Sequence, residues 1–200
     1  TGIDLPGEKS GIMPSHEWKL ATKGVVWTPG ETVVAGIGQG YVLTTPMQLA
    51  VMTARIANGK DAVVPSLLST LNGMGRNFAP LDIPESALAV IRRGMSAVLY
   101  GGAGTANKYK LSKKYGGMAG KTGTVQVKRI TLAQREKGVT KNIDRPWKER
   151  DHALFVAYAP RKNPRYAISV VVEHGGSGSS TAAPVARDIL AKTIAERGLA

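Results

Sequence analysis

The sequence predicts an α+β fold in which helices cover an antiparallel sheet. Two apolar runs of strand length, residues 151–160 and 165–175, stand on either side of the short turn PRKNP, which is typical of an antiparallel hairpin. A β-branched segment from Lys121 to Thr131 precedes this hairpin. The chain has 200 residues, of which 42% are hydrophobic, so it can bury one good core or two small ones.

The helical patterns come before and after the strands. Residues 1–36 are rich in Gly, Pro and short polar segments, and we expect an irregular connection with few regular elements there. The first helix follows, with Thr45 as its cap, Pro46 at the first helical position and Gln48 completing a capping box. Gly59 ends this helix.

Two further helices are predicted. One extends from Pro84 to about Tyr100, and the other closes the chain, with Ser180 or Thr181 as its cap and Gly198 as its stop. The apolar residues of the helix that ends near Tyr100 recur on one face, which we expect to join the core: Leu88, Ile91, Met95, Val98 and Leu99.

The charge balance narrows the classes of partner. The formal net charge is +13, and the basic residues concentrate in residues 108–115 and 128–150. Such a surplus attracts anions. Basic and acidic residues alternate in 128–150, however, aromatic residues make up only 6% of the chain, and no nucleic-acid recognition motif is present. We therefore expect a solvated basic face and no nucleic-acid partner.

Metal and cofactor chemistry is not indicated. The chain has no Cys, so thiolate sites and disulfides are excluded. Its three histidines, His16, His152 and His174, lack the spacing of a zinc site. We expect no metal and no cofactor, and we expect His152 and His174, at strand ends, to be structural imidazoles.

The segment GGMAGKTGTVQV, residues 116–127, contains the candidate site. A phosphate-binding loop needs four residues between its glycines, whereas Gly116 and Gly120 are separated by three, and a strand pattern follows where a helix should begin. GIGQG, residues 36–40, likewise lacks the third glycine of a dinucleotide fingerprint. Both nucleotide-binding interpretations fail.

The remaining interpretation uses Lys121 and its neighbours as a carboxylate site. Lys121 supplies a positive charge at the start of a strand, and Thr122 and Thr124 supply hydroxyl donors. Gly123 has no Cβ, so a ligand can approach the strand closely and pair with its backbone. This chemistry suits a substrate carboxylate beside an acyl group under attack.

KTGTVQV is similar to the third active-site motif of penicillin-binding proteins and serine β-lactamases, which follows S-x-x-K and S-x-N. The segments TGIDLPGE, MPSHEWK, GIGQGYVLTTPMQLA, GGAGTA, AGKTGTVQV, DHALFVAYAP and VVVEHGG occur in the order seen in class B penicillin-binding proteins. The chain resembles this family over nearly all of its length. The resemblance implies a partial penicillin-binding or serine β-lactamase-like transpeptidase fold.

In function, the resemblance implies a peptidoglycan D,D-transpeptidase that cross-links stem peptides through an acyl-serine and is acylated by β-lactams. Lys121, Thr122 and Gly123 would hold the substrate carboxylate. Thr124 would supply an oxyanion-hole N–H from its backbone and a second carboxylate contact from its hydroxyl. GIGQG and the helix over 46–58 would be scaffold. The parent protein would be anchored at the periplasmic face of the bacterial inner membrane and would work with a membrane glycosyltransferase.

The chain departs from the family pattern in one respect. None of its eleven serines has Lys three residues later or Asn two residues later; Ser15 comes nearest, with Lys19 four residues on. We therefore expect residues 1–200 to be the C-terminal portion of one transpeptidase domain, without the upstream S-x-x-K and S-x-N motifs. Such a piece would be inactive alone, would expose apolar surface and would oligomerise or swap segments.

Three alternatives remain open. The chain could be a non-catalytic module that binds carboxylates or polyanions. The basic segment 128–150 could face anionic lipid headgroups or dock the glycosyltransferase. The Gly/Ser run GGSGSST, residues 175–181, could line the rim of the site or form a flexible turn.

Overall fold

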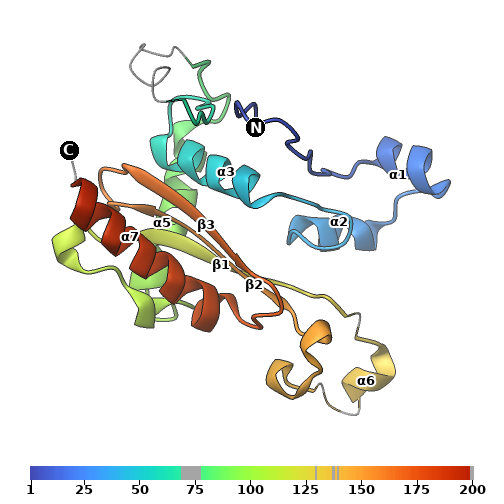
Figure 1. The fold of residues 1–200 in the computed structure, drawn as a ribbon. Helices are drawn as coiled ribbons and strands as arrows, with labels where there is room; N and C mark the ends of the chain where they lie inside the picture. The colour runs from blue at the N-terminus through green and yellow to red at the C-terminus, as the bar shows by residue number, and fades with distance from the viewer. Residues whose placement is uncertain (69–77, 129, 137, 139, 199–200) are drawn as a thin grey trace.

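The computed structural model describes residues 1–68, 78–128, 130–136, 138 and 140–198. Its centre is an antiparallel sheet of three strands in the order β1-β2-β3 (Figure 1). The strands are β1 (Ala119–Val125), β2 (His152–Ala159) and β3 (Tyr166–Val172). The predicted hairpin is β2 and β3, and the predicted α+β class is confirmed.

Helices cover both faces of the sheet. They are α3 (Pro46–Asn58), α5 (Glu85–Tyr100) and α7 (Ala183–Arg197), and Figure 1 shows α7 lying along one face. Alternate residues of β2 point to opposite faces, so β2 contributes to both layers. One buried cluster joins Phe155 to Leu190 of α7, and the other joins Tyr158 to Met95 of α5.

Most helix boundaries follow the local signals. Thr45 and Gln48 form the predicted capping box of α3, and Gly59 ends that helix in the left-handed conformation. The predicted apolar face of α5 is confirmed for Leu88, Met95 and Leu99, which are buried. Ile91 is the exception, because 42% of it is exposed.

Residues 1–36, expected to be an irregular connection with few regular elements, are more regular than predicted. Two short helices lie there, α1 (His16–Lys23) and α2 (Pro29–Gly36). Ser15 caps α1 by accepting from the Trp18 N–H, so the segment around Ser15 is regular. The Lys19 ammonium lies 2.6 Å from the Glu31 carboxylate and, with the Thr28 N–H, lowers the pKa of Glu31. Such tertiary contacts stabilise helices that are too short to form alone.

The predicted strand from Lys121 to Thr131 also needs correction. The strand β1 begins at Ala119 and ends at Val125, so Lys121 is its third residue. Thr131 lies instead at the start of α6 (Leu132–Glu136). The Gln134 backbone N–H donates to the Thr131 hydroxyl, and the Thr131 backbone N–H donates to the side-chain oxygen of Gln134. This reciprocal pair is a capping box, which starts a helix beyond the end of the strand. Arg129, Lys137 and Val139 of the basic segment lie outside the described residues.

The cap of α7 was also predicted wrongly. The helix begins after Ala182, with no side-chain cap, and the Thr181 hydroxyl donates to the Gly175 carbonyl instead. Gly198 ends the helix, as predicted. The remaining short elements are η1 (Asn107–Tyr109), η2 (Lys113–Tyr115), η3 (Asn142–Asp144), η4 (Trp147–Glu149) and the π-turn η5 (Gly178–Ala182).

The N-terminal part of the chain exposes apolar side chains. Among the large ones, Met13 is 80% exposed, Val26 and Val33 are each 71% exposed, and Ile37 is 74% exposed. Exposed apolar surface of this kind favours association, and oligomerisation of the chain stays a prediction. Within the described part of the chain, no helix is both long and apolar enough to span a membrane.

Candidate functional site

The four predicted site residues lie on one edge strand. Lys121, Thr122, Gly123 and Thr124 are consecutive residues of β1, which pairs with β2 on one side. Within the described strands β1 has no neighbour on its other side. Lys121 is exposed, and its ammonium donates to the Thr122 carbonyl at 2.7 Å. A cation and an open strand edge therefore lie together.

The Thr124 backbone faces this open edge. Its carbonyl accepts from the Gln39 side-chain amide at 2.9 Å, and Gln39 comes from the loop after α2. In an antiparallel strand, the N–H and C=O of one residue point to the same side. The Thr124 N–H therefore points away from β2, where an extended ligand could accept from it.

A second hydroxyl lies beside Thr122. The Thr105 hydroxyl is 3.1 Å from the Thr122 hydroxyl, and Thr105 belongs to the GGAGTA loop that follows α5. The loop passes so close to the end of α5 that a Cβ at Gly104 would overlap the Ala97 and Val98 carbonyls. Two hydroxyls at hydrogen-bonding distance can orient each other toward an anion.

Residues 175–181 pack behind the strand. Gly178 is buried, and a Cβ there would overlap the carbonyl oxygens of Gly123 and Leu154. We expected a ligand to approach the backbone closely at Gly123. On this side of the strand, Gly178 of the same chain makes that close approach. Of the two earlier interpretations of this run, the contact favours a packed element at the site over a flexible turn.

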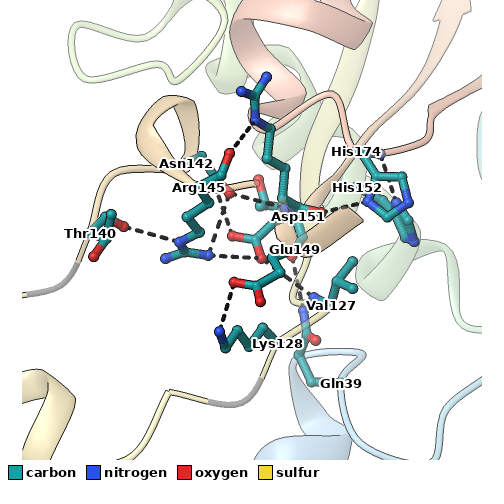
Figure 2. A network of polar contacts seen from close by, with 12 residues as sticks. Gln39, Val127, Lys128, Thr140, Asn142, Arg145, Glu149, Asp151, His152 and His174 are labelled. Carbon is teal, nitrogen blue, oxygen red and sulfur yellow. Dashed lines mark hydrogen bonds and ion pairs between the residues drawn. The ribbon is translucent and has the colours of Figure 1, made fainter. Parts of the chain in front are cut away.

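A polar network closes the end of the sheet where β1 stops (Figure 2). The Asp151 carboxylate is its centre: it accepts from the Val127 N–H at 3.4 Å and the Asn142 amide at 2.9 Å, and pairs with Arg145 at 3.4 Å. Asp151 is only 6% exposed, and its carbonyl accepts from the Gly176 N–H. Asp151 thus joins the chain that leaves β1 to the chain that enters β2 and to the 175–181 loop.

The two predicted structural histidines lie at the edge of this network. The His174 N–H donates to Nδ1 of His152 at 2.9 Å, and Nδ1 of His174 lies 2.9 Å from the Arg150 carbonyl. These contacts fit a structural role for both rings. Among the described residues, no group of three or more His, Asp or Glu side chains could hold a metal ion.

Sequence reasoning missed Gln39 and Thr105. Gln39 lies in GIGQG, which we expected to be scaffold alone, and its contact with Thr124 spans 85 residues of sequence. Thr105 lies in GGAGTA. Both residues follow glycines in motifs that carry the family resemblance, and this is the signal that could have identified them.

An open Lys-Thr-Gly strand, backed by a C-terminal helix and faced by α5, fits the class of penicillin-binding proteins and serine β-lactamases. The family model for the penicillin binding protein transpeptidase domain matches residues 1–191, and the chain belongs to this family. Within it, the domain is of the MrdA or PBP2 type, which confirms the class B interpretation.

Curated relatives show this similarity directly. The chain is 38% identical over 200 residues to the peptidoglycan D,D-transpeptidase MrdA of Salmonella typhimurium (strain LT2), with 95% of the chain and 31% of the relative covered. It is 36% identical over 197 residues to MrdA of Acinetobacter baumannii, with 92% of the chain and 28% of the relative covered. The chain thus spans less than a third of the length of these two relatives.

Solved structures agree in fold. The complex between PBP2 and MreC from Helicobacter pylori matches with a TM-score of 0.80 at 31% identity, covering 100% of the chain and 34% of that protein. Pseudomonas aeruginosa PBP2 in complex with WCK 5153 matches with a TM-score of 0.76 at 39% identity, covering 98% of the chain and 39% of that protein.

Proposed function

We propose that the chain supplies the carboxylate-binding strand of a peptidoglycan D,D-transpeptidase, which cross-links stem peptides through an acyl-serine and is acylated by β-lactams. The observation that carries the proposal is the open edge of β1, where exposed Lys121 lies beside the outward-facing backbone of Thr124. A stem peptide that ends in a carboxylate can extend along this edge as an added strand.

Each residue then has a role in acyl transfer. Lys121 attracts the substrate carboxylate, and the hydroxyls of Thr122 and Thr124 donate to it. The Thr124 N–H points to the same edge and stabilises the negative oxygen that develops when the acyl carbon is attacked. Gly178, which also has no Cβ, packs against the Gly123 carbonyl from behind the strand. No step in this scheme uses a metal or cofactor.

We propose that the nucleophile precedes these residues in the protein, and that residues 1–200 are the C-terminal portion of one transpeptidase domain. The support is the sequence itself, because none of its eleven serines stands three residues before a lysine. The serine closest to the pattern, Ser15, caps α1 and accepts from a backbone N–H.

This proposal predicts that the 200-residue chain alone forms no covalent adduct with a fluorescent penicillin. The attack requires a serine activated by a nearby base, and no serine of the sequence stands in the S-x-x-K pattern that supplies this pair in the family. Denaturing electrophoresis after incubation measures the adduct, with the intact protein as the positive control. A labelled band from the chain alone would show that one of its own serines is the nucleophile.

The intact protein is proposed to work at the periplasmic face of the bacterial inner membrane, together with a membrane glycosyltransferase of the elongation machinery. The similarity to MrdA relatives supports this assignment. The Helicobacter pylori relative has been solved as a complex with MreC, and this complex supports the proposal that the intact protein has a protein partner.

A non-catalytic module that binds carboxylates or polyanions is the second candidate. The net charge of +13 favours it, because such a surplus attracts anions without any chemistry. The two candidates differ in the intact protein: a binding module would not be acylated by a β-lactam, whereas a transpeptidase would.

Under the proposed function, Gln39 is a positioning residue. Replacing Gln39 with Ala in the intact protein removes the hydrogen bond to the Thr124 carbonyl, so we expect the second-order rate of β-lactam acylation to fall about threefold to tenfold. Stopped-flow fluorescence measures the rate, and the loss should lie in the acylation step. Gln134→Ala is the matched control, since Gln134 caps α6. Equal rates in the wild type and Gln39→Ala would exclude this role.

A further inference from the structure

A concave site lies at the other end of the sheet from Thr124. Thr124 pairs with Ala153 at one end of β2, whereas Tyr158, which pairs with Ala119, lines this cavity at the other end. The cavity has a volume of about 710 Å³ and lies between the end of α3, the first turns of α5 and the β2–β3 turn. Its volume is in the range of small-molecule sites.

The charges that line the cavity are mostly of one sign. Five lining residues are basic and one is acidic: Lys60, Arg92, Arg93, Arg161, Lys162 and Glu85. Glu85 pairs with Arg92, and among the described residues none of the other four basic residues forms an ion pair. A concave surface with such a surplus focuses positive potential and concentrates anions.

Two of the guanidinium groups are held in place. Arg161 donates to the Ser96 hydroxyl at 3.2 Å and lies over the Tyr100 ring at 4.6 Å. Arg92 donates to the Ile56 carbonyl at the end of α3. A guanidinium has five N–H donors, so both groups keep donors for a ligand, and their fixed geometry lowers the entropy lost when an oxyanion binds.

The Tyr158 phenol lies near both groups. Burial raises the pKa of Tyr158, while the charges of Arg92 and Arg161 act in the opposite direction. The phenol therefore stays protonated at neutral pH and is available as a neutral donor. The exposed Lys60, Arg93 and Lys162 complete the lining, where they can move to meet an anion.

We propose that this cavity is a binding site for a phosphate-type oxyanion. Several cations around one concave surface fit a multiply charged anion better than a single carboxylate, and guanidinium groups match phosphate oxygens in pairs. The phosphate could belong to a soluble phosphorylated molecule or to the headgroup of an anionic lipid. The site is separate from the carboxylate-binding strand and does not depend on its function.

The test is calorimetric titration of the intact protein with inorganic pyrophosphate at low ionic strength. The double variant Arg93→Gln/Lys162→Gln should bind at least about tenfold more weakly, because two charge-assisted contacts are lost. Both residues are exposed, so the fold should be retained. The control Lys141→Gln/Lys148→Gln removes the same charge from exposed positions outside the cavity and should bind like the wild type.

A second arm identifies the source of the phosphate. Sedimentation with phosphatidylglycerol vesicles, with phosphatidylcholine vesicles as reference, should be reduced in the cavity variant if a lipid headgroup is the ligand. Pyrophosphate binding without vesicle binding assigns a soluble ligand. An equal loss of binding in both double variants, or no binding of either probe, would overturn the proposal.

Discussion

Replacing Lys121 with alanine in the intact protein is expected to lower the second-order rate of β-lactam acylation about a hundredfold. A hydrogen bond to a charged group contributes about 1.5–3 kcal/mol, and the upper part of this range corresponds to that factor. Lys121 is exposed and its polar contact within the described residues is with the neighbouring Thr122 carbonyl. Its loss should therefore change stability by less than about 0.5 kcal/mol.

Rapid-mixing fluorescence with a penicillin measures the rate. The same experiment on a β-lactam ester without the carboxylate separates a role of Lys121 in binding the carboxylate from any other effect of the substitution on acylation. If Lys121 binds the carboxylate, the ester should react at similar rates with the wild type and Lys121→Ala. Lys113→Ala, which removes an exposed lysine just before β1, is the matched control and should keep the wild-type rate. A rate for Lys121→Ala within twofold of the wild type would refute the assigned role.

Local signals were enough to predict the elements that form the framework. The capping box of α3 and the β2–β3 hairpin depend on residues close in sequence, so the sequence alone predicts both. Gly198 stops α7 for the same reason. The Lys-Thr-Gly strand follows from the resemblance to a family, because several motifs in the same order are far more specific than the tripeptide alone.

Contacts between distant segments account for what the sequence did not reveal. The short helix α2 is an exception, since Thr28, Pro29 and Glu31 carry the same local start signals that predict α3. Gln39 meets Thr124 across 85 residues, and Gly178 meets Gly123 because of a packing that only the folded chain creates. The start of β1 was placed too late because Ala119 and Gly120 have low strand propensity and are held there by pairing with β2.

Asp151 is the clearest case of such long-range organisation. Sequence position alone gives it no role, since it is one of 14 acidic residues in a basic chain. In the fold it is buried and is paired with Arg145, whose side chain is 11% exposed. It also accepts hydrogen bonds from Val127 and Asn142. Both ends of the connection between β1 and β2, residues 126–150, therefore depend on one carboxylate.

Asp151→Ala is therefore expected to lower the free energy of unfolding by about 3 kcal/mol, because it leaves the Arg145 guanidinium buried without its partner. Asn at this position should cost less, since it keeps an acceptor for the Val127 N–H. Urea unfolding followed by circular dichroism measures both. Asp188→Ala is the control: its carboxylate is 67% exposed on α7, so its loss should stay within about 0.5 kcal/mol. If Asp151→Ala and Asp188→Ala were equally stable, the network would be a surface feature that water replaces, and the end of β1 would be held by pairing with β2 alone.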